Sequence, residues 1–335
     1  EKRGIKGGKN TKTGYSTSAE VLEELAADNP IISDILEYRQ LAKLKSTYAD
    51  GLANCVDDDG RVRSTFMQTV TATGRISSTE PNLQNIPTRI DFGKQLRKVF
   101  KPAEGKVYID ADYSQIELRV LAHLSEDEHM IEAFKNGEDI HRQAASKVFG
   151  VSQEEVTKEQ RSSAKAVNFG IVYGISIFGL AERLSVSRAE AKTLIDDYYN
   201  TYPTIKEYMN NVIENARTCG YVETLFHRKR FLPDINSKNA TVRGYAERNA
   251  VNAPIQGTAA DIIKIAMVNI YNKIKSMRLK SKMILQVHDE LIFNIPKEEI
   301  SIMKSLIVSE MENAYKLSVP LLVECGIGKN WLEAH

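Results

Sequence analysis

Two aspartates close a run of strand-forming residues in the first half of the chain. Residues 107–109 are Val, Tyr and Ile, which favour a buried strand, and the turn residues Pro102 and Gly105 precede them. Asp110 and Asp112 come next, and a strand that leaves a core can hold such carboxylates rigidly enough to bind a hard cation through oxygen. Alternatively, the aspartates cap a helix over residues 114–124, and this stretch alone favours the cap.

A second acidic group lies far downstream. Two apolar runs flank His288, Asp289 and Glu290, so residues 283–295 are predicted to form a β-hairpin whose turn presents acids. Taken alone, such a turn usually exposes its acidic side chains to solvent and has no further role. If the two tips meet, Asp112 and Asp289 can share two divalent ions ~3.5–4 Å apart, an arrangement that clamps both oxygens of an in-line phosphoryl displacement.

One predicted helix carries two cations and two aromatic rings on the same side. Arg161, Lys165, Phe169 and Tyr173 are four residues apart, so each is rotated only ~40° from the last and all lie within an arc of ~120°. Spacing alone favours an amphipathic helix with solvated cations and buried rings, yet that helix would bury rings on the side that exposes the cations. A nucleoside triphosphate removes the conflict, because its phosphates need the cations and its base and sugar can stack on a ring.

Composition sets wider limits. With 335 residues, of which 42% are hydrophobic, the chain can bury a sizeable core in two or three structural units. No apolar run reaches the ~18 residues of a membrane span and no secretory signal opens the sequence, so we expect a soluble, intracellular protein. Cys55, Cys219 and Cys325 are too few and too scattered for a disulfide framework or a zinc site.

Positive charge is local, since the net charge is only +1. Arg39 and Lys43 share a helical stretch, and residues 227–230 form a compact run, His-Arg-Lys-Arg. Each group is most simply a solvated face, but binding to a phosphate backbone needs such patches.

The remaining pattern is mostly helical. A first helix is predicted between Ser18, its N-cap, and Pro30. Further helices are predicted over residues 32–53, 122–134, 140–149, 154–173, 187–199, 204–216, 241–252, 257–277 and 297–317, with strands over residues 62–71 and 321–324 and a short hairpin over residues 221–232.

Five segments resemble those of the bacterial family A DNA polymerases, in the same order and at similar spacing. DYSQIELR at residues 112–119, RSSAKAVNFGIVYG at 161–174 and VHDE at 287–290 match the three polymerase motifs of the family. TATGRISS at 71–78 and NAPIQGT at 252–258 match two further segments. The resemblance runs from about residue 14 to residue 335 and concerns the polymerase domain.

The resemblance implies an α+β, right-hand polymerase fold. It has an antiparallel β palm, helical fingers and a truncated helical thumb. Residues 1–57 would be part of the thumb, 58–120 the first part of the palm, 121–232 the fingers and 233–335 the second part of the palm, with a fingers–palm boundary near 240–257. The abrupt start inside the thumb suggests a piece of a longer chain.

The implied reaction is attack of a primer 3′-hydroxyl on a deoxynucleoside triphosphate, releasing pyrophosphate, in DNA replication and repair. Two Mg²⁺ ions, for which Mn²⁺ is expected to substitute, would be held by Asp112, the carbonyl of Tyr113 and Asp289, supported by Glu290. Lys165 would be catalytic as a proton donor. The implied partners are primer-template DNA and deoxynucleoside triphosphates, with no membrane, in a monomeric, cytoplasmic bacterial protein that associates with the nucleoid during repair.

The resemblance also assigns binding roles. The residues implied to contact the nucleotide are Arg161, Lys165, Phe169, Tyr173, Gln115, Glu117 and His288, with Glu117 blocking a ribose 2′-hydroxyl. The residues implied to contact DNA are Arg39, Lys43, Arg75, Asn82, Gln84, Arg89, Arg248, Asn252 and Gln256. For Arg75 the implied site is the minor groove, where acceptors occur at every base pair, so a donor can sense pair geometry without reading sequence.

Two other functions fit parts of the sequence. Paired aspartates also serve two-metal nucleases, which would leave the cations and rings of residues 161–173 without a purpose. A DNA-binding remnant without activity would predict a broken acidic pair, and both aspartates are present.

Overall fold

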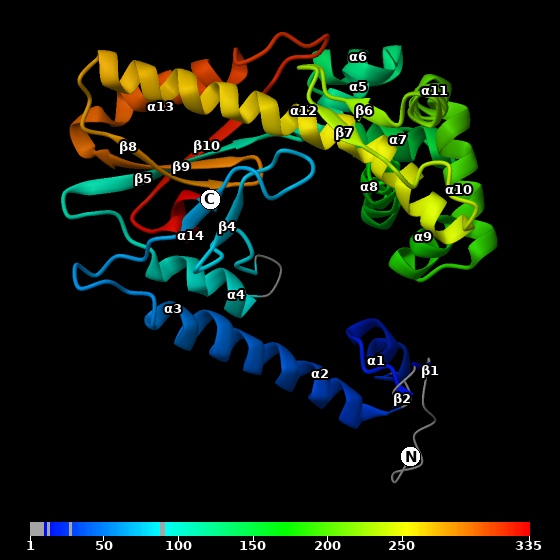
Figure 1. Ribbon diagram of the computed structural model, residues 1–335, viewed down its shortest axis with the longest axis horizontal. Helices are drawn as coiled ribbons and strands as arrows, with labels where there is room; N and C mark the ends of the chain where they lie inside the picture. The colour runs from blue at the N-terminus through cyan, green and yellow to red at the C-terminus, as the bar shows by residue number, and fades with distance from the viewer. Residues whose placement is uncertain (1–9, 12–13, 27–28, 88–90) are drawn as a thin grey trace. The chain divides into compact units, whose positions relative to one another are not determined.

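The computed structural model describes residues 10–11, 14–26, 29–87 and 91–335 (Figure 1). The chain divides into two compact units. Unit 1 takes in the chain up to Phe66 together with Ser78–Phe100, and unit 2 takes in Met67–Ser77 and Lys101–His335. Within the described ranges, no helix is long and apolar enough to cross a membrane.

Unit 1 is mainly helical. Its elements are β1 (Asn10–Thr11), β2 (Gly14–Tyr15), α1 (Ala19–Ala26), α2 (Pro30–Lys43), the π-helical η1 (Leu44–Asp50), α3 (Gly51–Ala53), α4 (Asp91–Leu96) and the 3-10 turn η2 (Arg97–Val99). The helix predicted over residues 32–53 is confirmed as the continuous run from α2 to α3. The strand predicted over residues 62–71 is only β3 (Thr65–Met67), which pairs with β4 (Ser77–Thr79), because the strand ends where its short partner ends.

Unit 2 is built on a four-stranded antiparallel sheet in the order β10-β5-β9-β8. The strands are β5 (Lys106–Tyr113), β8 (Lys282–Val287), β9 (Glu290–Pro296) and β10 (Val323–Gly328). Side chains alternate across a sheet, so the apolar Ile109, Ala111 and Tyr113 of β5 enter the main hydrophobic core. Asp110 and Asp112 therefore lie on the opposite face. The α+β class and the antiparallel sheet are confirmed.

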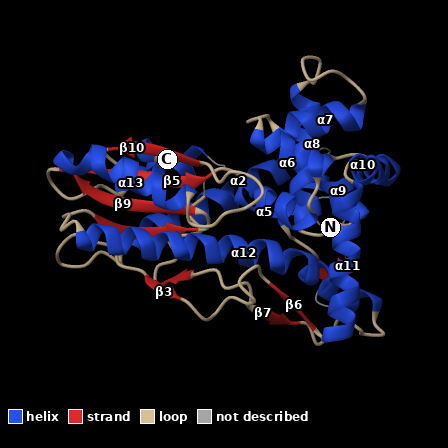
Figure 2. Cartoon of the chain, turned by 90° about the horizontal axis from the view of Figure 1, so that it is seen from above, coloured by secondary structure: helices blue, strands red, loops and turns tan. Residues whose placement is uncertain are grey.

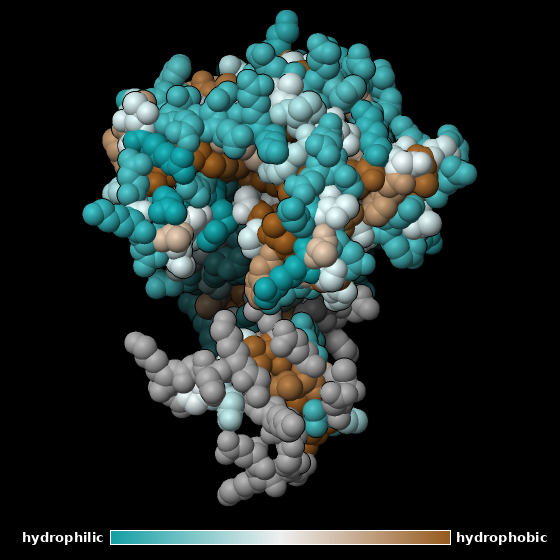
Figure 3. All heavy atoms as spheres, turned by 90° about the vertical axis from the view of Figure 1, so that its right-hand side faces the viewer, coloured by the Kyte–Doolittle hydropathy of each residue, from teal (hydrophilic) through white to brown (hydrophobic). Residues whose placement is uncertain are grey.

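Helices cover the sheet and continue beyond it. They are α5 (Ile116–Ser125), α6 (Glu128–Lys135), α7 (Ile140–Phe149), α8 (Lys158–Val172), α9 (Ile177–Leu184), α10 (Arg188–Thr201), α11 (Pro203–Cys219), α12 (Ala240–Ser276), α13 (Ile300–Glu312), preceded by the 3-10 turn η3 (Lys297–Glu299), and α14 (Trp331–Ala334). Helices α12 and α13 lie along one face of the sheet, and α12 runs on to the helices that follow β5 (Figures 1 and 2). On the side of those helices the surface of unit 2 is largely hydrophilic with isolated apolar patches (Figure 3).

Several predicted boundaries are wrong for identifiable reasons. The helices predicted over residues 241–252 and 257–277 form the single helix α12, with Pro254 inside it. Proline and glycine usually break helices, but here both Pro254 and Gly257 are buried by packing partners. Conversely, the helix predicted over residues 122–134 is divided between α5 and α6 by Glu126, whose φ is 52°. Helices α4, α9 and α14 were not predicted, whereas the hairpin of β6 (Tyr221–Glu223) and β7 (Lys229–Phe231) was.

Candidate active site

The acids of β5 belong to the strand itself. Helix α5 begins at Ile116, and its N-cap residue is Gln115, in the left-handed region with φ 55°, without a side-chain capping bond. The interpretation of the aspartates as helix caps is therefore wrong. Because the two-residue period places Asp110 and Asp112 on one face, the strand presents both carboxylates to the same side of the sheet.

The downstream hairpin brings its acids to the same place. Strands β8 and β9 are joined at His288 and Asp289, and the φ of 55° at His288 allows the tight turn. Asp112 lies opposite Glu290 in the register of β5 and β9. The N–H of Tyr113 donates a hydrogen bond of 3.2 Å to the carbonyl oxygen of Asp289. The two acidic tips therefore meet, which is the condition that a shared metal site requires.

Electrostatics at this meeting point favour a cation. Burial, followed by the negative charges of Asp289 and Glu290, raises the pKa of Asp112. Burial likewise raises the pKa of Asp289, with Arg75 and His335 acting in the opposite direction. The Oδ1 atom of Asp112 is buried and accepts no hydrogen bond from the described residues. Raised pKa values mean that the charged carboxylates are disfavoured here unless a proton or a cation compensates them, and a divalent ion with oxygen ligands is one such cation.

Glu117 connects the acids to the helix that carries the cations and rings. It is 6% exposed and accepts a hydrogen bond of 2.6 Å from Nη2 of Arg75. Tyr173 and Gln256 also form hydrogen bonds with its carboxylate. Burial raises its pKa, against the effect of Arg75. Three predicted residues from distant segments thus meet at the buried carboxylate of a fourth, Glu117.

The loop that carries Arg75 is held by a side chain from the basic run at 227–230. Arg228 donates to the carbonyl oxygens of Thr73 at 2.5 Å and Gly257 at 2.8 Å and pairs with Asp261 at 2.7 Å. Its guanidinium also occupies the space where a Cβ on Gly74 would lie. Arg228 is therefore committed to internal contacts, which corrects the interpretation of this run as a solvated or phosphate-binding patch at that residue.

Helix α8 carries the predicted row of cations and rings. A capping box between Thr157 and Gln160 begins the helix. Arg161 pairs through Nε with Asp139 at 2.7 Å, and Nζ of Lys165 lies 6.0 Å from the centre of the Phe169 ring. Phe169 is only half-buried and Tyr173 is 43% exposed. We call Arg161, Lys165, Phe169 and Tyr173 the α8 face. Phe169 packs against the main hydrophobic core while remaining partly exposed, so the alternative of buried aromatics fails for Tyr173 and holds only in part for Phe169.

Two residues behind the α8 face were not predicted. Asp139 is the N-cap of α7 and, besides binding Arg161, accepts hydrogen bonds from the N–H groups of His141 and Arg142. His141 is 2% exposed, and its ring centre lies 5.6 Å from that of Phe169. Burial lowers the pKa of His141 to about 4. The only sequence signal was an aspartate directly before a predicted helix, which is also an ordinary cap.

The residues predicted on α12 line up beside this site. Arg248 packs against Gly174, whose φ is 64°, and lies near the ring of Tyr245 at 5.9 Å. Asn252 is half-buried one turn further on, and Gln256 reaches Glu117. Spacing by four residues along a continuous helix therefore places all three on one side.

The other predicted DNA contacts belong to unit 1. Arg39 donates to the carbonyl oxygen of Thr17 at 2.5 Å, and Lys43 is exposed in the last turn of α2. Asn82 and Gln84 accept hydrogen bonds from the backbone N–H groups of Gln84 and Ser78 at 3.0 and 3.1 Å. Arg89 lies outside the described residues.

Paired acids on an antiparallel sheet, next to a helix that carries two cations and two aromatic rings, are the arrangement expected of template-copying nucleotide polymerases. The family model for DNA polymerase family A matches residues 1–333, and the chain belongs to that family.

Individual relatives agree with this family assignment. The chain is 53% identical over 335 residues to DNA polymerase I of Lactococcus lactis subsp. cremoris and 58% identical over 326 residues to that of Caldicellulosiruptor bescii. These matches cover 100% and 97% of the chain but 38% of each relative. A solved structure, the POL domain of Pol1 from M. smegmatis in complex with DNA primer-template and dNTP, superposes with a TM-score of 0.94 at 46% identity, covering 99% of this chain and 59% of that one.

Proposed function

We propose that the chain catalyses template-directed DNA synthesis. The primer 3′-hydroxyl oxygen bonds to the α-phosphorus of a deoxynucleoside triphosphate while the bond to the bridging oxygen breaks and pyrophosphate leaves. The observation that carries the proposal is the contact of Tyr173 with Glu117. It joins the end of the α8 face to the helix that follows Asp112, so acids and cations serve one reaction.

The subdomain assignment belongs to the proposal. Residues 1–57 are part of the thumb, 58–120 and 233–335 form the palm and 121–232 the fingers. The antiparallel sheet within the palm ranges and the run of helices from α6 to α11 within the fingers range support it.

Asp112, Asp289 and the Tyr113 carbonyl are the groups that would hold two Mg²⁺ or Mn²⁺ ions, with Glu290 in support. The buried, unpartnered Oδ1 of Asp112 supports this assignment among the residues that the structure describes. When bound, such ions lower the pKa of an attacking hydroxyl and offset charge on the phosphates. The contribution of the chain is to hold the acids in fixed register on β5 and the β9 turn.

The α8 face binds the nucleotide. Arg161 offers a planar fork to the phosphates and Lys165 a point charge that also protonates the leaving oxygen, while the base stacks on Phe169 near Tyr173. Glu117 excludes a ribose 2′-hydroxyl, and Gln115 and His288 complete the pocket. The exposure of this face and its two cations support the assignment.

Primer-template DNA is the partner, contacted by Arg39, Lys43, Arg75, Asn82, Gln84, Arg89, Arg248, Asn252 and Gln256. The M. smegmatis POL domain, which is 46% identical and was solved with DNA primer-template and dNTP bound, supports this. A monomer in the bacterial cytoplasm, at the nucleoid during repair, is the setting we propose, supported by the bacterial relatives.

Primed template incubated with and without the four deoxynucleotides tests the proposal. Lengthening that stops at the first position needing a withheld nucleotide is expected. Shortening of the primer without nucleotides would instead favour a nuclease.

A further inference from the structure

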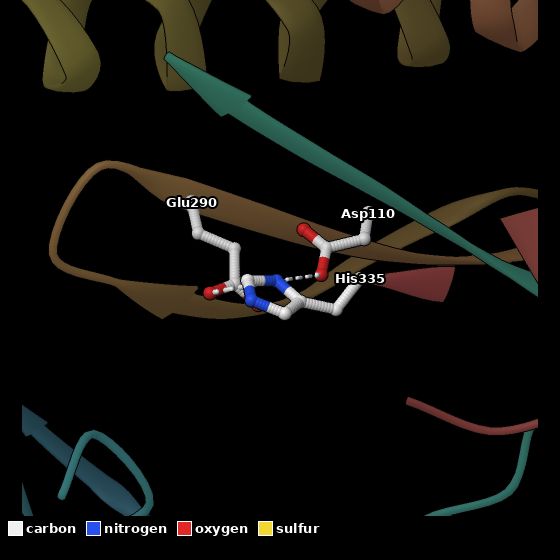
Figure 4. Close-up of side chains that lie close together, drawn as sticks. All are labelled: Asp110, Glu290 and His335. Atoms are coloured by element: carbon white, nitrogen blue, oxygen red, sulfur yellow. Dashed lines mark ion pairs between the residues drawn. The ribbon is translucent and has the colours of Figure 1, made fainter. Parts of the chain in front are cut away.

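A second group of potential metal ligands lies on the acidic face of the sheet. Asp110 and Glu290 are 3% and 4% exposed, and His335 approaches both (Figure 4). One ligand atom from each of the three residues lies within 4.8 Å of the other two. Neither Asp112 nor Asp289 is a member. Glu290, which we propose supports the ions of the reaction, is the one acid that the two groups share.

The buried carboxylate of Asp110 lacks the hydrogen bonds that it needs. Neither of its oxygens accepts a hydrogen bond from any described residue. Nδ1 of His335 lies 3.3 Å from Oδ2, whereas a charge-assisted hydrogen bond measures about 2.7–2.9 Å. A buried charge without such bonds is costly unless a cation compensates it. The imidazole contact alone does not supply that compensation.

The separations suit an ion placed between the ligands. Three atoms bound tetrahedrally at ~2.1 Å from one ion lie about 3.4 Å apart. Nδ1 of His335 lies 3.3 Å from Asp110 and 3.8 Å from Oε2 of Glu290. From the unpartnered Asp110 carboxylate and these separations, we propose that Asp110, Glu290 and His335 form a further cation site, which takes a divalent transition-metal ion.

The nitrogen ligand determines the class of ion. Mg²⁺ and Ca²⁺ prefer all-oxygen sets, whereas imidazole together with carboxylates suits Zn²⁺, Co²⁺ or Mn²⁺. His335 is 42% exposed in its side chain, which leaves room for water as a further ligand. The remaining oxygen of Glu290, Oε1, accepts a hydrogen bond of 2.8 Å from Nε1 of Trp331, which fixes the carboxylate as outer partners of metal ligands do.

Two glycines make this geometry possible. A Cβ on Gly326 or Gly328 of β10 would meet the backbone of Glu333 and Ala334. Because these two glycines have no side chains, α14 can lie directly on the edge of the sheet. The close approach carries His335 over β5, so the proposed ion would fasten α14 to the two central strands.

Co²⁺ titration of a chain that carries Asp112→Asn and Asp289→Asn tests the proposal, because these substitutions neutralise the acids assigned to polymerisation. We expect one Co²⁺ per chain, seen as visible d–d absorption bands, and Co²⁺-dependent protection of the α14 amides from hydrogen exchange. Added His335→Ala or Asp110→Asn should weaken binding by more than the ~10–100-fold that loss of an outer partner costs.

The exposed His129 provides a matched control, since His129→Ala removes a histidine that lies outside the group. Unchanged Co²⁺ affinity in this control is expected. Equal affinity for His335→Ala and His129→Ala, or no bound Co²⁺, would overturn the proposal. Because the readout is binding, it stands apart from the outcome of the primer-extension test.

Discussion

The acidic face of the sheet and the α8 face hold their functional groups in different ways. Asp112 and Glu290 are short side chains on paired central strands, where the register leaves them little freedom. Arg161 and Lys165 are long side chains on the accessible side of α8, one paired with Asp139 and the other above a ring. The sheet holds its carboxylates at fixed positions, whereas the helix carries long cationic side chains that can extend toward a ligand.

This difference determines what a substitution should cost. Uncompensated carboxylates in a buried site oppose folding, so their removal should impair chemistry without lowering stability. Cations on an exposed face contribute little to stability when their ion pairs are solvated. Substitutions in both regions should therefore lower activity without unfolding the protein, but the loss of activity should differ between the two regions.

The largest effect is expected for Asp112→Ala and Asp289→Ala. Each should lower primer extension by roughly 1,000-fold or more, because the ions would lose a ligand that no neighbour can replace. Single-turnover extension measures the loss, and thermal melting without metal should show unchanged or higher stability. Near-normal incorporation by either variant would remove the basis for the metal assignment.

Removing the cations of the α8 face should cost less. Arg161→Ala and Lys165→Ala are each expected to lower kcat/KM for the nucleotide by roughly 100-fold, or about 2.7 kcal/mol. Arg161→Lys is the control that keeps the charge and loses the fork, and it should fall between Arg161→Ala and the unaltered chain. If all three variants match the unaltered chain, phosphate binding lies elsewhere.

Glu117→Ala should change selectivity more than rate. We expect ribonucleotide incorporation relative to deoxynucleotide to rise by about tenfold, since a buried carboxylate would no longer occupy space beside the sugar. Glu117→Gln keeps the volume and removes the charge. Equal sugar selectivity in Glu117→Ala and the unaltered chain would show that Glu117 only anchors Arg75, Tyr173 and Gln256.

The fold and much of the site could be predicted because their signals are periodic or local. Strand-forming residues at 107–109 and the apolar runs that flank residues 288–290 predicted two segments that end in acids, and spacing by four predicted the α8 face. The resemblance supplied Glu117, Arg75 and Gln256. Periodicity does not show that they share a hydrogen-bond network, which depends on packing of segments that are far apart in the chain.

What could not be predicted depended on tertiary contacts. Pro254 lies inside α12 and is buried there, although proline usually ends a helix. Arg228 looked like part of a basic patch, and only the fold brings it to Thr73 and Asp261. His335 and Asp110 are separated by most of unit 2 in sequence, so neither had a recognisable partner before the sheet was formed.

The smallest effect is expected for Asp139. Its carboxylate holds the guanidinium of Arg161, one of the two long cationic side chains of the α8 face. Its pKa is raised by burial but lowered overall by the hydrogen bond from Arg161 and those from the α7 backbone. Asp139→Asn should preserve the cap of α7, since asparagine caps helices well, and should remove the charge that orients Arg161.

The side chains of Arg161 and Asp139 are 38% and 34% exposed, so their pair is worth at most about 1 kcal/mol, or about fivefold. We therefore expect Asp139→Asn to raise the KM for nucleotide by roughly two- to fivefold, with kcat nearly unchanged. Asp139→Ala should show the same KM and an additional loss of stability from the missing cap. Steady-state kinetics and thermal melting of both variants separate the two roles. A lower KM in Asp139→Asn would mean that Asp139 competes with the phosphates for Arg161, and the α8 face would then be held back by its neighbour instead of positioned by it.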